Sequence, residues 1–202
     1  MVATASPRFK RRLTREDILP LAESATVRRE HRGRIAEIKQ RRRIEVGPFA
    51  TFHFENYDTM RQQVQEMLYI EKGGDAQLKD EFSAYNPLIP QGDELVATVM
   101  FEIDEPARHT EVLSRLGSIE NHAFLDVAGE RIGGQPDPTR ENTSAEGKAS
   151  AVQFLKFPFT PGQINQFKTP GTQVVVGFDH PNYAHMAVLP EPVRAALSGD
   201  FD

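Results

Sequence analysis

Every second residue from Leu95 to Ile103 is apolar, and no other stretch of the chain restricts the local fold as strongly. A period of two is typical of a β-strand that buries one of its faces. The pattern therefore predicts a strand over 94–103. Weaker patterns of the same kind, bounded by turn residues, predict further strands at 44–55, 122–128, 130–132, 150–157, 172–179 and 183–189.

Between these strands lie short segments with helical spacing. The clearest is 59–72, where Met60, Val64, Met67 and Leu68 fall on one face. Others are 75–85, 106–117, 161–168 and 192–198. Because strands come in adjacent pairs with short helices between them, we predict an α+β fold. Its sheet should be mostly antiparallel and flanked by short helices.

The N-terminal fifth of the chain has a different character. We expect a flexible lead-in at 1–12, a basic helical segment at 13–43 and a single α+β domain at 44–202. In the helical segment, Val27, His31, Ile35 and Ile38 form one narrow apolar stripe. So narrow a stripe predicts a helix lying across a surface, with its arginines in water or against a partner.

The net charge of the chain changes sign at the boundary between residues 43 and 44. Residues 1–43 hold 13 Lys and Arg against 5 Asp and Glu, a net +8, and the rest hold 11 against 24, a net −13. A basic arm on an acidic body could bind nucleic acid, dock an acidic partner or fold back onto its own body. Phe9 is the only aromatic residue in the arm, which weakens the nucleic-acid interpretation because base stacking needs aromatic rings.

The chain contains no cysteine. This excludes disulfides, thiolate zinc sites and protein-ligated iron–sulfur clusters, and leaves His, Asp and Glu to hold any transition metal. No apolar run approaches the roughly 20 residues of a membrane span, and the basic start lacks the apolar region of a secretory signal. We expect a cytoplasmic protein.

The densest group of polar residues runs from Asp179 to His185. A hairpin is expected here, and pairing of Asp179 with Tyr183 would set Gly177 opposite His185. Two imidazoles and a carboxylate at a hairpin tip could supply metal ligands or a general base. The alternative is that the polar groups stabilise the turn and the imidazoles are solvated.

A second group surrounds the predicted strand end near residue 55. His53 and Glu55 share a strand face, while Arg61 and Gln65 share a helix face one turn apart. With Asn56 and Asp58 these residues form a site only if the junction turns the carboxylates toward a pocket. Otherwise they belong to a solvated surface. Farther on, Tyr85-Asn86-Pro87 predicts a rigid loop, either for recognition or as an ordered turn.

Together these motifs resemble a bacterial family described as domain of unknown function 3501, over about residues 13–197. The resemblance rests on Arg41-Arg42-Arg43, Val46-Gly47-Pro48, Phe54-Glu55-Asn56 with Asp58-Thr59, Gln65-Glu66-Met67, Tyr85-Asn86-Pro87-Leu88 with Pro90, and Asp179-His180-Pro181 with Tyr183. It implies a cytoplasmic protein encoded beside a rubrerythrin-like protein and an iron–sulfur oxidoreductase, with a role in redox or peroxide stress. The family has no assigned activity, so no catalytic residue is implied.

Three functions follow as hypotheses. The first is an accessory protein that binds a redox partner. The second is a metal-dependent enzyme using His53, Glu55, His180 and His185. The third is nucleic-acid binding through the basic arm. Candidate binding residues are Arg41, Arg42, Arg43, Asn56, Asp58, Arg61, Gln65, Tyr85, Asn86, Asp179 and Tyr183.

Overall fold

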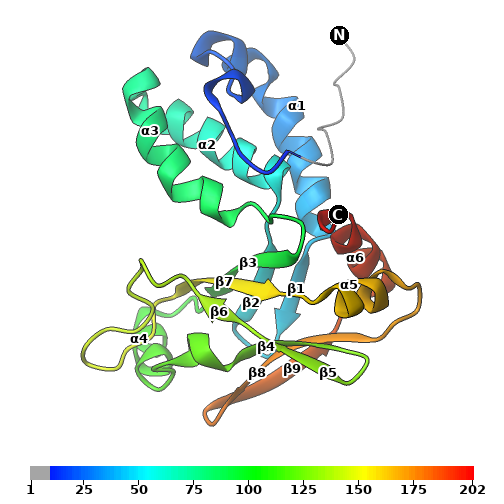
Figure 1. The fold of residues 1–202 in the computed structure, drawn as a ribbon. Coiled ribbons are helices and arrows are strands. Elements are labelled where there is room, and N and C mark those ends of the chain that lie inside the picture. Colours follow the sequence, from blue (N-terminus) through cyan, green and yellow to red (C-terminus); the bar gives the residue numbers. More distant parts are fainter. Residues whose placement is uncertain (1–9) are drawn as a thin grey trace.

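Two antiparallel sheets form the centre of the molecule in the computed structural model, which describes residues 10–202 (Figure 1). The first sheet has the order β1-β2-β3-β7-β6, with bounds Arg43–Val46, Ala50–Phe54, Glu94–Phe101, Val152–Pro158 and Gln135–Pro136. The second has the order β5-β4-β8-β9, with bounds Glu130–Gly133, Ala123–Val127, Val174–His180 and Tyr183–Val188. The predicted lead-in lies mostly outside the described residues.

The main hydrophobic core lies between the two sheets. From the first sheet, Leu95, Ala97, Val99 and Phe101 enter it on alternate positions of β3, as their spacing predicts. From the second sheet, Phe178 packs against Phe52 with ring centroids 5.1 Å apart. Ring pairs of this kind stabilise the fold by about 0.5–1.5 kcal/mol in addition to the effect of burying their apolar area.

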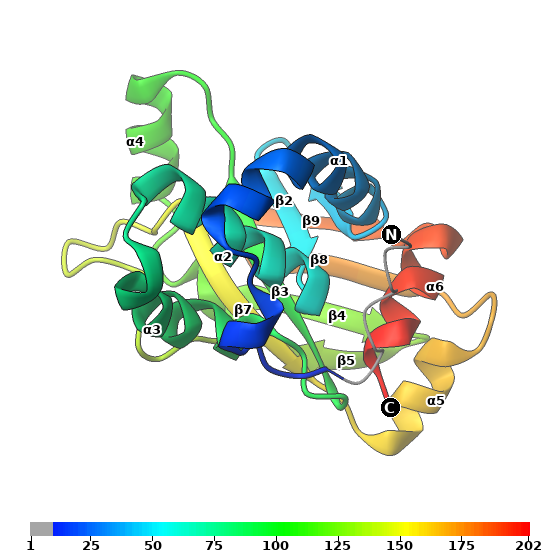
Figure 2. The same cartoon turned by 90° about the horizontal axis from the view of Figure 1, so that it is seen from above.

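A layer of three helices covers part of the opposite face of the first sheet (Figures 1 and 2). These are α1 (Leu21–Gln40), α2 (Tyr57–Glu71) and α3 (Gly74–Tyr85). Their contacts build a second core, in which Met60, Val64 and Leu68 of α2 meet Leu78 of α3 and Val96 of β3. Asn56 starts α2: its Oδ1 accepts from the Thr59 backbone N–H at 3.0 Å, while Thr59 Oγ1 accepts from the Asn56 N–H at 2.9 Å.

The remaining helices lie at the margins of the sheets. They are α4 (Pro106–Ser114), α5 (Pro161–Lys168) and α6 (Glu191–Leu197), and α5 and α6 lie together near the C-terminus (Figure 2). Short 3-10 helices within the described residues span Arg15–Asp17, Asn86–Leu88, Ile119–His122 and Ser198–Asp200.

The α+β prediction is confirmed, although the strands form two packed sheets. The expected hairpin register at the C-terminal strands is wrong by one residue. His180 pairs with Tyr183, so Phe178 faces His185 and Gly177 faces Met186. A two-residue turn at Pro181 and Asn182 sets this register, because the Asn182 backbone N–H donates to His180 Nδ1 at 3.1 Å. No helix within 10–202 has the length and apolar character needed to cross a membrane.

Candidate functional site

Helix α1 lies on α2 through the narrow stripe predicted for it. Ile35 is buried, while Val27, His31 and Ile38 are half-buried. Most other side chains of α1 face solvent. The basic segment is therefore not enclosed by its own subunit, and its outward surface is free to meet another molecule.

The charges of α1 are sorted to two sides of the helix. At about 100° per residue, Arg28, Arg29, Arg32 and Lys39 fall on one side, which we call the basic flank. Glu23, Glu30 and Glu37, each seven residues apart, fall on the other side, which we call the acidic flank and which also carries Arg34. The basic flank borders a surface hollow of about 390 Å³ lined by Ala25, Arg28, Arg29, Arg32 and Tyr69.

Among the arginines of the basic flank, Arg28 alone is held by side chains of residues 10–202. The guanidinium of Arg28 lies 4.1 Å from the Tyr69 ring centroid, and its NH2 donates to Glu66 Oε2 at 2.7 Å. This ion pair with Glu66 raises the pKa of Arg28 further above its ordinary value. Arg29, Arg32 and Lys39 are exposed, and none of them forms an ion pair with another residue of the described chain.

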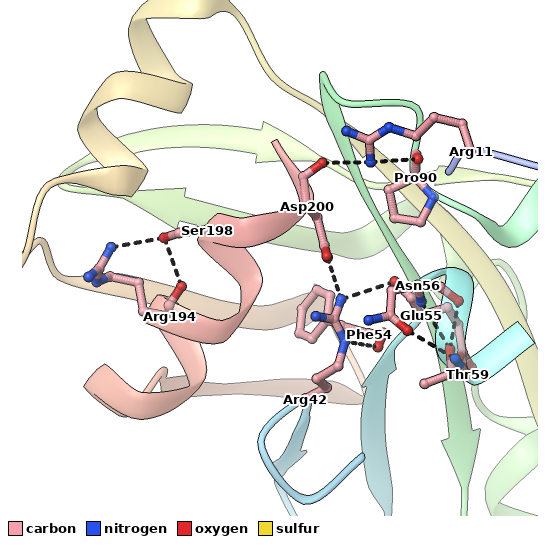
Figure 3. A network of polar contacts seen from close by, with 10 residues as sticks. All are labelled: Arg11, Arg42, Phe54, Glu55, Asn56, Thr59, Pro90, Arg194, Ser198 and Asp200. Carbon is pink, nitrogen blue, oxygen red and sulfur yellow. Dashed lines mark hydrogen bonds and ion pairs between the residues drawn. The ribbon is translucent and has the colours of Figure 1, made fainter. Parts of the chain in front are cut away.

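Arg42 does not belong to that exposed surface, contrary to its predicted role in docking. It is 4% exposed, and its Nε and NH2 donate to the carbonyls of Phe54 (2.9 Å) and Glu55 (3.1 Å). It also forms an ion pair with buried Asp200 (Figure 3). Burial raises the pKa of Asp200, against the lowering effects of Arg42 and Arg11. Arg42 therefore joins the sheet to the C-terminal segment.

The neighbouring arginines of the triplet differ from Arg42. Arg41 is exposed, and Arg43 is exposed with its NH2 2.6 Å from Glu45 Oε1. The predicted triplet therefore divides into one structural residue and two surface residues. Arg61 lies half-buried on α2.

Two predicted binding residues hold the N-terminal segment onto the helical layer. Asn86 Oδ1 accepts from the Leu13 backbone N–H at 2.7 Å, and its Nδ2 donates back to the Leu13 carbonyl. Gln65 binds Leu19 in the same way: its Oε1 accepts from the Leu19 backbone N–H at 2.9 Å, and its Nε2 donates to the Leu19 carbonyl at 3.2 Å. Both side-chain amides therefore form hydrogen bonds within their own subunit. Part of the basic segment thus folds back on its own body, while α1 keeps its outer surface.

A hollow of about 320 Å³ lies beside the Arg42–Asp200 pair. Asn56 and Asp58 line it together with Lys10, Arg11 and Arg42. Asn56 is occupied as the cap of α2, and Arg11 donates to the Pro90 and Asp200 carbonyls at 3.1 and 2.9 Å (Figure 3). The polar groups of this hollow mainly bind one another.

His53 and Glu55 do face a cleft, as their shared strand face allows. The cleft has a volume of about 360 Å³ and lies where α1, α2, α3 and the outer face of the first sheet meet. Tyr85 lines it as well, but Asp58 faces the other hollow. Burial lowers the pKa of His53, although Glu55 and Glu102 act to raise it.

The C-terminal hairpin uses its polar groups for structure. His180 Nδ1 accepts from Asn182, and its Nε2 lies 3.2 Å from the Gly117 carbonyl, so neither nitrogen is left for a metal. The buried hydroxyl of Tyr183 donates to the Val46 carbonyl at 2.7 Å and accepts from the Phe49 and Ala50 N–H groups at 2.9 Å. Burial raises the pKa of this hydroxyl.

Asp179 and His185 also have partners at this hairpin. Asp179 Oδ1 lies 2.8 Å from His122 Nδ1, and its Oδ2 lies 2.8 Å from Arg131 NH2. The hydrogen bond from His122 is the main reason for the lowered pKa of Asp179. His185 is exposed and packs beside Tyr183, with ring centroids 4.6 Å apart.

The four proposed metal ligands are not brought together. His53 and Glu55 line the cleft on the first sheet, while His180 and His185 lie on the second sheet. Among residues 10–202, no group of three His, Asp or Glu side chains is arranged to hold a metal ion. The hairpin and the strand do not converge because they belong to different sheets.

Several residues that shape these sites carry no sequence signal. Asp200 pairs with Arg42 across 158 positions of sequence. Lys39 of α1 and two residues of β3, Thr98 and Met100, also line the His53 cleft. Only the expected alternation of β3 placed Thr98 and Met100 on one face, and nothing indicated which face the helices would cover.

Comparisons with known proteins place the chain in a group without an assigned activity. The family model described as protein of unknown function (DUF3501) matches residues 12–201. A crystal structure of a novel protein of unknown function from Burkholderia pseudomallei is similar, with a TM-score of 0.87 and 36% sequence identity. That similarity covers 94% of this chain and 99% of the other. No curated protein matches the sequence.

Proposed function

Since this chain belongs to the DUF3501 family of proteins of unknown function, we propose a function from its own surface: it is a binding protein that docks an acidic partner protein through the basic flank of α1. The observation that carries this proposal is the set of exposed cations without internal ion pairs, Arg29, Arg32 and Lys39. They are displayed by a protein whose remaining body, residues 44–202, carries a net charge of −13.

Physical reasons favour a protein over a nucleic acid as the partner. The acidic flank of the same helix carries Glu23, Glu30 and Glu37, which would oppose a polyanion that covers the whole helix. Tyr69, the aromatic side chain in the adjoining hollow, is already stacked by Arg28. A helix with one basic and one acidic side instead suits a partner of complementary pattern, which fixes its orientation on docking.

The family resemblance identifies the partners to test first. These are the rubrerythrin-like protein and the iron–sulfur oxidoreductase encoded beside such proteins. With no cysteine to ligate a cluster, this chain would serve them as an accessory protein rather than as an electron carrier of the iron–sulfur type. Such a complex would place it in the response to redox or peroxide stress.

The test reverses charge on each side of α1. Arg29→Glu with Arg32→Glu changes the basic flank, and Glu30→Lys with Glu37→Lys is the matched control on the same helix. We expect the first pair to weaken binding to either partner at least about tenfold at low salt, and the control to leave it unchanged or stronger. Calorimetry or a pull-down with each purified partner measures the effect.

Two results would overturn the proposal. One is that neither partner binds the wild-type protein even at low ionic strength. The other is that both charge-reversed pairs bind equally well. If a DNA duplex binds instead, with strong salt dependence that the Arg29 and Arg32 changes remove, the basic flank is a nucleic-acid surface.

A further inference from the structure

The cleft at His53 contains a buried histidine nitrogen with nothing to bind. Nε2 of His53 has no hydrogen-bond partner among residues 10–202. Leaving such a group unpaired in the interior costs about 1–3 kcal/mol. A cleft of about 360 Å³ is within the range of small-molecule sites. The nitrogen itself is closed to solvent, so a ligand in the cleft would reach it after a small shift of the side chains around it.

Glu55 places a negative charge at the base of the same cleft. Its side chain is held from two sides, because Oε1 accepts from Thr98 Oγ1 at 2.8 Å and Oε2 accepts from Thr59 Oγ1 at 2.7 Å. The residue is 6% exposed. It forms no ion pair with any residue of the described chain. Hydroxyl groups orient a buried carboxylate but do not neutralise it, so a cation would complete the site.

The walls of the cleft are mainly aromatic and apolar. Met60, Leu88 and Phe154 lie in it with the ring of Tyr85, and Met100 is 37% exposed on its sheet side. Rings and thioethers of this kind favour an apolar ligand body and tolerate a nearby organic cation. Lys39 lies at the rim, exposed and unpaired, where it would oppose a second positive charge.

We propose that this cleft binds a small organic amine with an apolar body. The ammonium group pairs with the Glu55 carboxylate and donates to His53 Nε2, and the apolar part covers Met60, Met100 and Phe154. The lowered pKa of His53 agrees with this arrangement, because a neutral imidazole can accept a hydrogen bond from an ammonium group. The cleft shares Lys39 with the proposed docking surface. The two tests remain distinct, because the docking test changes only Arg29 and Arg32 and the amine site is measured without a partner protein.

The probes are hexylamine, hexanol and hexanoate, which share one tail and differ in charge. Their binding is followed through the methyl resonances of methionine in the full-length protein. Met60 and Met100 line the cleft, whereas Met67 and Met186 do not and serve as internal controls. We expect hexylamine to shift the Met60 and Met100 signals at concentrations up to about 20 mM, which covers weak binding by a ligand of this size. Hexanol and hexanoate should bind more weakly.

Two substitutions should change the affinity for hexylamine in opposite directions. Glu55→Gln should lower hexylamine affinity at least about tenfold, because it removes a charge-assisted contact. Lys39→Gln should raise that affinity about two- to fivefold, because it removes a like charge at the rim. Lys79→Gln, at an exposed lysine of α3 away from the cleft, is the matched control and should change nothing.

Three outcomes would overturn the proposal: no shift of Met60 and Met100 with hexylamine, equal binding of all three probes, or weaker hexylamine binding after Lys39→Gln. Equal binding would identify a plain apolar groove, and weaker binding after Lys39→Gln would show that the Lys39 side chain supports the ligand instead of repelling it. If Glu55→Gln disturbs the Met67 and Met186 signals as well, the Lys39→Gln measurement still decides, because that side chain is exposed and bonds to nothing in the described chain.

Discussion

Asp17 illustrates how one side chain fastens the N-terminal segment. Its carboxylate pairs with Lys10 and accepts from the Thr14 N–H at 2.8 Å, and its own side chain is 4% exposed. Burial raises its pKa, but hydrogen bonds from Lys10, Tyr57 and Thr14 outweigh that effect and lower the pKa from 3.8 to about 2. The folded protein therefore favours the ionised form of Asp17.

This shift predicts a loss of stability in acid. Well above pH 3.8 the carboxylate is ionised in both states and stabilises the fold fully. As the pH falls from 3.8 to about 2, the unfolded chain takes up the proton first, and up to about 2 kcal/mol is lost. Asp17→Asn should remove this contribution to the pH dependence of urea unfolding. Glu16→Gln, at the exposed neighbouring residue, is the control. If the free energy of unfolding depends on pH equally in the two variants, the prediction is wrong.

At the scale of elements, the β8–β9 hairpin depends on a close approach of two backbones. A Cβ atom at Gly177 would lie 2.6 Å from the His185 carbonyl oxygen and 2.8 Å from the Met186 Cβ. The register expected from the sequence would have set Gly177 opposite His185. In the observed register Gly177 lies opposite Met186, and glycine is required because atoms of His185 and Met186 occupy the space of a side chain.

Gly177→Ala should therefore destabilise the protein by about 2 kcal/mol, the cost of forcing atoms into a packed site. Gly133→Ala on β5 is the matched control, because nothing lies within 4 Å of its added Cβ. We expect that variant to stay within about 1 kcal/mol of the wild type. Thermal or urea unfolding measures both. Equal effects would show that contact at Gly177 is not the cause.

At the scale of the whole molecule, the Arg42–Asp200 pair connects the start of the first sheet with the end of the chain. Both residues are buried, so removing one charge leaves the other uncompensated. Asp200→Asn should lower the free energy of unfolding by about 3 kcal/mol. Glu45→Gln breaks the exposed pair with Arg43 and should change it by less than about 1 kcal/mol. Urea unfolding compares them, and similar losses would contradict a structural role for the buried pair.

The sequence by itself determined the α+β class, the helical and extended segments and the apolar stripe of α1. It could do so because periods of two and 3.6 residues depend only on local backbone geometry. It also brought His53 and Glu55 to one strand face for the same reason.

Only the tertiary structure decided which polar residues meet. Asn86 and Gln65 became clamps for Leu13 and Leu19, and Arg42 was buried against Asp200, while His180 and His185 went to a different sheet from His53. These pairings join residues far apart in the chain. They are set by how the layers pack and by the hydrogen-bonding needs of buried groups, neither of which leaves a periodic pattern in a single sequence.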